Sequence, residues 1–131
     1  MGTVEFRFTL SDQVKSSPAL TDPLLGTVYG NIFLQEDVGV FGPRDGAKEF
    51  GAVEVKNVDL RTEKTSAANF ITPKMALGKY VFLGFFDVDG NGASIHAPDK
   101  GDPATLALTN KFEITDGAQT KRVILFEIVF N

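Results

Sequence analysis

The sequence predicts an all-β protein, with a single β-sandwich of seven or eight mainly antiparallel strands over residues 1–131. Three observations lead to this prediction. Stretches with alternating apolar and polar residues recur along the chain, and turn signals rich in Gly, Pro, Asn and Asp separate them. No convincing amphipathic helix exceeds about three turns, which is typical of sandwiches and barrels.

The composition supports one globular domain and disfavours two classes of partner. The 131 residues are 43% hydrophobic and 23% charged, and they include twelve Phe, two Tyr and no Trp. We therefore expect the aromatic side chains to form a core rather than a stacking platform. The formal charge of -4 disfavours nucleic acids and anionic membranes, because both require a basic face. No segment approaches the roughly 20 apolar residues of a membrane-spanning helix, so we expect a soluble chain.

The first half of the chain contains three predicted strands. Val4–Leu10 alternates without a fault and is followed by a polar surface connection over Ser11–Pro23. A second strand runs from Leu25 to about Gln35, and Glu36–Phe50 has the Gly, Pro and charged residues of an exposed loop. The third strand begins at Val53. Its alternation slips between Lys56 and Asn57 before Val58 and Leu60 resume it, which predicts a β-bulge there.

The second half begins with a short strand near Asn69–Thr72. Tyr80–Phe86 then predicts a central strand covered on both faces, because nearly every residue is apolar. Asp116-Gly117 is a hairpin signal between the last two of the remaining predicted strands. Those strands are Thr105–Leu108, Lys111–Thr115 and Lys121–Phe130.

Oxygen-bearing side chains occupy every second position directly after the predicted central strand. Asp87, Asp89 and Asn91 supply these oxygens, and Gly90 and Gly92 permit the positive φ values that folding around an ion requires. Calcium takes 6 to 8 oxygen ligands, whereas magnesium suits such a flexible loop poorly. The pattern therefore predicts a calcium site.

The rest of the loop excludes an EF-hand. Pro98 stands at the twelfth position, where an EF-hand requires a bidentate Glu, and neither flank is helical. Asp99 and Asp102 are the candidates to close the shell, together with the backbone carbonyl of Ala93. Converging carboxylates without a counter-ion would be unfavourable. The alternative is that residues 89–92 form only a tight turn.

Catalytic motifs are absent from the sequence. His96 is the only histidine and there is no Cys, which disfavours zinc and cysteine chemistry. No serine lies in a Gly-x-Ser-x-Gly motif, and the missing Trp disfavours a glycosidase cleft. We therefore expect a non-catalytic protein.

Three segments follow one another in the second half of the chain: a Pro turn at Phe70–Pro73, a Gly-x-Tyr strand at Leu77–Phe82 and an acidic loop at Phe86–Gly92. This order resembles the prealbumin-like sandwich domains related to the carboxypeptidase regulatory domain. Thr27–Ile32 is similar to their opening strand and Ile114–Val123 to their closing hairpin. The resemblance implies an immunoglobulin-like or prealbumin-like sandwich. The long loop at residues 36–50 and the extra N-terminal strand depart from that pattern.

The resemblance also implies a non-catalytic accessory module of an exported protein that is secreted, periplasmic or on the cell surface. A related hydrolase has several catalytic His residues and a Tyr-Arg-Gly-Ser motif that this chain lacks. Calcium is the expected partner, and a protein or carbohydrate at the cell surface is the candidate ligand. The alternative function is a C2-like, calcium-dependent membrane module, which requires a second acidic loop with an apolar tip. Asp37, Asp45 and Phe41 are the candidates for that loop.

Overall fold

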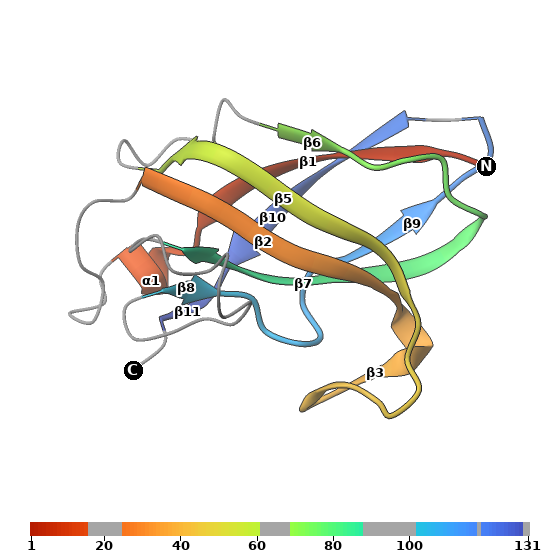
Figure 1. Cartoon of the computed structure of the whole chain (residues 1–131), viewed down its shortest axis with the longest axis horizontal. Helices are drawn as coiled ribbons and strands as arrows, with labels where there is room; N and C mark the ends of the chain where they lie inside the picture. Colours follow the sequence, from red (N-terminus) through yellow and green to blue (C-terminus); the bar gives the residue numbers. More distant parts are fainter. Residues whose placement is uncertain (16–24, 61–68, 88–101, 118, 130–131) are drawn as a thin grey trace.

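The N-terminal strand β1 (Thr3–Leu10) is the middle strand of a three-stranded sheet in the computed structural model (Figure 1). The model describes residues 1–15, 25–60, 69–87, 102–117 and 119–129. β1 pairs in parallel with β10 (Gln119–Phe126), from Thr3 opposite Gln119 to Leu10 opposite Phe126. On its other side it pairs antiparallel with β6 (Asn69–Ile71).

The second sheet has six strands in the order β11-β8-β7-β2-β5, with β9 also paired to β7. All of its strand pairs are antiparallel, so the two packed sheets form a mostly antiparallel β-sandwich, as predicted. Among the described residues, seven strands of the molecule have three or more residues. The strands of this sheet are β2 (Leu25–Leu34), β5 (Glu49–Asp59), β7 (Gly78–Asp87), β8 (Pro103–Ala104), β9 (Lys111–Ile114) and β11 (Ile128–Val129).

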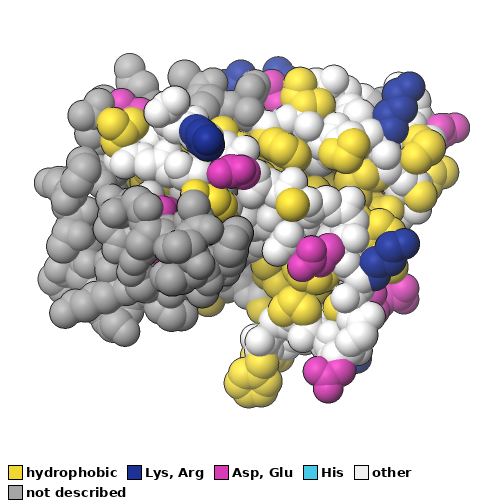
Figure 2. Space-filling view, viewed as in Figure 1, with side chains coloured by type: hydrophobic (Ala, Val, Ile, Leu, Met, Phe, Trp, Pro, Cys, Tyr) yellow, Lys and Arg dark blue, Asp and Glu magenta, His cyan; other side chains and the backbone are white. Residues whose placement is uncertain are grey.

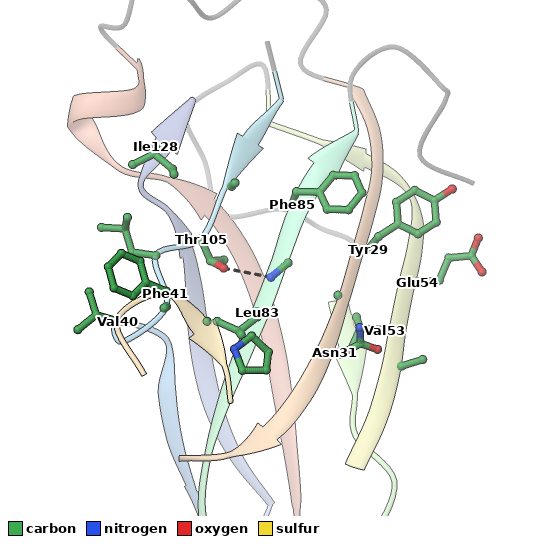
Figure 3. A pocket seen from close by; sticks show the side chains of 18 residues that line it. Tyr29, Asn31, Val40, Phe41, Val53, Glu54, Leu83, Phe85, Thr105 and Ile128 are labelled. Carbon is green, nitrogen blue, oxygen red and sulfur yellow. Dashed lines mark hydrogen bonds between the residues drawn. The ribbon is translucent and has the colours of Figure 1, made fainter. Parts of the chain in front are cut away.

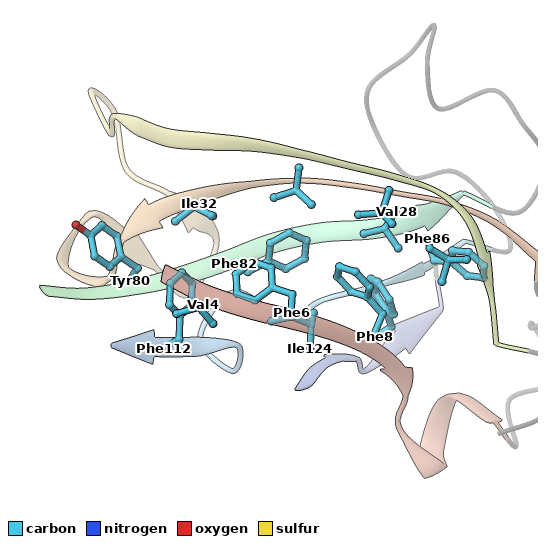
Figure 4. Close-up of a cluster of buried hydrophobic side chains, with 14 of the residues drawn as sticks. Val4, Phe6, Phe8, Val28, Ile32, Tyr80, Phe82, Phe86, Phe112 and Ile124 are labelled. Atoms are coloured by element: carbon cyan, nitrogen blue, oxygen red, sulfur yellow. The ribbon is translucent and has the colours of Figure 1, made fainter. Parts of the chain in front are cut away.

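Phenylalanine rings from both sheets fill the space between them (Figure 4). Phe6 of β1 lies with its ring centroid 5.5 Å from that of Phe82 in β7 and 5.1 Å from that of Phe112 in β9. Phe126 of β10 stacks on Phe86 of β7 at 6.2 Å. Each of these contacts joins one sheet to the other. The expectation that the aromatic residues serve the core is confirmed for these rings.

The predicted strands over 4–10, 25–35 and 80–86 are confirmed, and so is the bulge. Gly26 pairs with Val58 and Val28 with Val55, so β5 contains one residue more than β2 over this stretch. Asn57 accommodates the extra residue with a φ of 60°, a left-handed conformation that Asn tolerates better than most residues. Along β2, Val28 and Ile32 are buried in the core and Leu34 packs against it.

The loop at residues 36–50 has more structure than predicted. It begins with the 3-10 turn η1 (Gln35–Asp37) and continues as a hairpin of β3 (Val38–Gly39) and β4 (Gly42–Pro43). Val38 is buried against Phe33 and Val81, which anchors the hairpin to the six-stranded sheet. Helix α1 (Asp12–Lys15) interrupts the other predicted loop. In the part of the chain that the structure describes, no helix is long and apolar enough to span a bilayer.

The predicted strand at Thr105–Leu108 is wrong, because the strand lies two residues earlier, at β8. Thr105 takes up both hydrogen-bonding groups of Gly84: its N–H donates to the Gly84 carbonyl at 2.9 Å, and its Oγ1 accepts from the Gly84 N–H at 3.0 Å. The chain then turns over residues 107–109. Leu106 and Leu108 are consequently exposed rather than part of a strand.

The predicted hairpin at Asp116-Gly117 is also wrong. A turn is present and Gly117 has a φ of 70°, but the flanking strands belong to different sheets. β9 pairs with β7, whereas β10 pairs with β1. The predicted last strand likewise divides at Glu127, where the chain passes from β10 to β11 in the other sheet.

Candidate functional site

Two of the six predicted calcium ligands lie in the described residues, and both are buried. Asp87 is the last residue of β7, and Asp102 directly precedes β8. Their exposed fractions are 3% and 0%. Charged residues are almost never this deeply buried in proteins without compensating partners. The predicted ligands Asp89, Asn91, Ala93 and Asp99 lie outside the described residues, as does His96.

The strand register relates the two aspartates to each other. β7 and β8 are antiparallel, with Phe85 opposite Ala104. Asp87 lies two residues after Phe85, and Asp102 lies two residues before Ala104. Asp87 and Asp102 therefore lie at the same end of this strand pair.

The two aspartates do not form a complete metal site by themselves. Within residues 1–15, 25–60, 69–87, 102–117 and 119–129, no group of three or more His, Cys, Asp or Glu side chains is arranged to hold a metal ion. A full calcium shell would need oxygens from the predicted ligands between residues 88 and 101.

A second feature, which the sequence analysis missed, is a groove of about 830 Å³ on the outer face of the six-stranded sheet. It lies between the sheet and the tip of the β3-β4 hairpin, and β2, β5, β7, β8 and β11 all contribute to it (Figure 3). Cross-strand pairing forms one row of side chains across all five strands. In order, the row is Glu54, Tyr29, Phe85, Ala104 and Ile128.

The groove explains why β7 is apolar on both faces. Its Tyr80, Phe82 and Phe86 point into the sandwich core. On the other face, the hairpin covers Val81, whereas Leu83 and Phe85 line the groove. The two-sided apolar pattern was therefore the signal for this site, although it was interpreted as complete coverage.

Tyr29 and Phe85 stack at the side of the groove nearest Asp87. Their ring centroids are 5.6 Å apart with an interplanar angle of 29°. Burial raises the pKa of the Tyr29 phenol above its ordinary value of 10.0, and the negative charges of Glu54 and Asp87 raise it further. A hydrogen bond with Thr27 opposes these effects on the pKa. Glu54 and Asp87 therefore place negative charge near this side of the groove.

Comparisons with family models, with curated proteins and with solved structures found no match to this chain. The fold class is therefore established by the structure itself. The resemblance to the prealbumin-like domains stays a prediction.

Proposed function

We propose that the protein is a non-catalytic, calcium-binding β-sandwich module of an exported or cell-surface protein. The observation that carries this proposal is the burial of Asp87 and Asp102 at the two ends of the segment predicted to wrap the ion. In this proposal the ion binds both carboxylates and joins the end of β7 to the start of β8. A protein or carbohydrate at the cell surface would be the ligand of the module.

Charge and geometry both support the choice of calcium. Buried carboxylates at one end of a strand pair repel each other when they converge, and a divalent cation relieves that repulsion more effectively than neutral hydrogen bonds. Side-chain oxygens of Asp89, Asn91 and Asp99, with the carbonyl of Ala93, would bring the shell to the 6 to 8 ligands that calcium takes. The ion would then stabilise the loop that follows the central strand, without a reaction.

The strand register argues against the C2-like alternative. That alternative requires the loop of Asp37, Phe41 and Asp45 beside the loop that follows Asp87. Asp87 pairs with Thr27, whereas Asp37 follows the other end of β2, where Leu34 pairs with Tyr80. These two ends are seven residues apart along β7, or about 23 Å at 3.3 Å per residue. The exposed hairpin tip is the one observation that favours this alternative.

Calcium binding is tested by calorimetry and thermal unfolding in calcium and in EDTA. Saturation at 100 times the dissociation constant contributes about 2.7 kcal/mol, which raises the melting temperature by roughly 5–15 °C in a protein of this size. We expect Asp87→Asn, Asp89→Asn and Asp102→Asn each to abolish most of this rise.

Glu113→Gln is the matched control, because Glu113 is an exposed carboxylate on β9, paired with Lys79. It should keep the full effect of calcium. An unchanged melting temperature together with no heat of binding for the wild-type protein would refute the proposal. Binding to anionic vesicles that requires both calcium and Phe41 would instead support the C2-like alternative.

A further inference from the structure

We propose that the groove on the outer face of the six-stranded sheet binds a small organic cation, with an amine or quaternary ammonium group on an apolar body. This site is distinct from the proposed calcium site and does not depend on it. The groove volume of about 830 Å³ is in the range of small-molecule sites, about 300–1,000 Å³.

The walls of the groove provide contacts for an apolar body. Figure 3 shows Val40, Phe41 and Ile128 on one side of Leu83 and Thr105, with Tyr29 and Asn31 on the other. Two small lining residues, Ala104 opposite Phe85 and Ala52 opposite Asn31, leave space beside the larger side chains of the sheet.

Four of the eleven large hydrophobic side chains that are exposed in the described residues line this groove. Phe41 is 104% exposed and Val40 is 73% exposed, at the tip of the hairpin. Figure 2 shows hydrophobic side chains standing out from the body where this hairpin lies. Leu106 and Ile128 are also exposed and line the same groove. Grouped exposure of this kind is typical of a binding surface rather than of scattered surface residues.

The charge of the lining selects a cation. Glu54 is the only charged residue among the described residues that line the groove, and no Lys or Arg lines it. Glu54 forms no salt bridge within the described residues, since the two ion pairs found there involve other groups. It pairs across the strands with Tyr29, whose ring stacks on Phe85. A carboxylate beside aromatic faces attracts an ammonium group both directly and through cation–π contacts.

The test uses two amphiphiles with the same tail and opposite charge, octyltrimethylammonium and octyl sulfate, both below their micelle concentrations. Binding is followed by amide NMR shifts in calcium and again in EDTA. We expect saturable shifts at Leu83, Gly84 and Thr105 with the cation. The anion should bind at least about fivefold more weakly. Because the shifts should appear with and without calcium, failure of the calcium proposal would leave this result unaffected.

Matched variants separate charge from apolar contact. Glu54→Gln should weaken binding of the cation about two- to fivefold, as expected for an exposed charge and a cation–π contact. It should not weaken binding of the anion. Glu113→Gln makes the same charge change outside the groove and should alter neither. Phe41 lies at an exposed tip and supports no core packing, so Phe41→Ser should weaken binding of both amphiphiles.

Three results would overturn the proposal. These are equal affinity for the two amphiphiles, shifts that spread over the surface without saturating, and an unchanged cation affinity in Glu54→Gln. A fourth result would assign the groove to a protein segment. In that case an alternating Leu-Lys peptide would shift the same amides while octyltrimethylammonium would not.

Discussion

Gly84 and Gly30 face each other across β7 and β2, and neither position has space for a side chain. A Cβ at Gly84 would overlap the Tyr29 carbonyl oxygen and lie 2.6 Å from Cζ of Phe82. A Cβ at Gly30 would also meet the Phe82 ring, at 2.5 Å. The two glycines therefore allow Phe82 to lie flat across the two central strands inside the core.

The first prediction concerns this close approach. We expect Gly84→Ala to lower the free energy of unfolding by about 1–3 kcal/mol, because the added methyl group overpacks a filled core. Denaturant unfolding measures the change. Gly51→Ala is the control, since its Cβ would make an ordinary contact at 3.6 Å with Cδ1 of Ile32. Equal effects of the two substitutions would show that loss of glycine, and not the contact, causes the change.

The second prediction concerns the Tyr29 phenol, whose pKa is raised by burial, Glu54 and Asp87. Tyr29 resists ionisation in the folded state, so its contribution to stability is complete below the ordinary pKa of 10.0 and is lost as the pH rises through the higher folded value. Glu54→Gln removes one of the negative charges and should move the Tyr29 pKa downward.

Absorbance of tyrosinate against pH measures this shift. A Tyr80→Phe background leaves Tyr29 as the chromophore, since the sequence has two tyrosines. Glu113→Gln should leave the Tyr29 curve in place. If Glu54→Gln and the control titrate identically, the charge of Glu54 does not act on this phenol.

Among the elements, Asn110 joins strands that belong to different sheets. Its side-chain Nδ2 donates to the Leu125 carbonyl at 2.9 Å, and its Oδ1 accepts from the Leu125 N–H at 2.9 Å. Its own carbonyl accepts from the Phe82 N–H at 3.0 Å. The amide thus pairs with β10 as a neighbouring strand would, while the backbone is fixed to β7.

The third prediction follows from these bonds. Asn110 is fully buried, so Asn110→Ala leaves two backbone groups of β10 without their partner and should cost about 2–4 kcal/mol. Asn110→Asp should also destabilise, because the carboxylate cannot donate to the Leu125 carbonyl. Thr109→Ala removes one exposed hydrogen bond next to this position and should change stability by less than about 1 kcal/mol. Hydrogen exchange at Leu125 would report the local opening, and unchanged protection in Asn110→Ala would contradict the prediction.

The strands themselves could largely be predicted because their signals are local. The alternation from Val4 to Leu10 and the phase slip at Asn57 follow from neighbouring residues alone. Pairing partners could not be predicted in the same way. Asp116-Gly117 correctly indicates a turn, but the burial of Ile124 and Phe126 beside β1 decides which sheet receives β10. β8 lies two residues earlier than predicted. Its position depends on the two hydrogen bonds between Thr105 and Gly84, which join residues far apart in the sequence.

The two candidate sites differ in the same respect. Asp87 and Asp102 could be selected from the sequence, because carboxylates close to one turn-rich segment are a local pattern. The groove could not, because five strands supply the row from Glu54 to Ile128. Phe41 was noticed for its apolar character, but its position over the sheet depends on the burial of Val38.

At the scale of the whole molecule, the three-stranded sheet pairs two strands from distant parts of the sequence, β1 and β10. β1 lies between β6 and β10, and the short β6 pairs with only three of its residues. The eight paired positions with β10 therefore supply most of its hydrogen bonds. In the core, the ring of Phe6 also contacts Phe112, and the ring of Phe8 contacts Phe126.

This pairing of strands far apart in the sequence governs the timing of folding. During synthesis, β1 leaves the ribosome well before its principal partner β10, so the three-stranded sheet cannot form until residues 119–126 have emerged. Until then, the apolar face of Val4, Phe6, Phe8 and Leu10 has no completed core to enter. Closure of so long a loop is slow, and a waiting apolar strand is prone to aggregate. Until β10 is made, the nascent chain is therefore exposed to aggregation through β1.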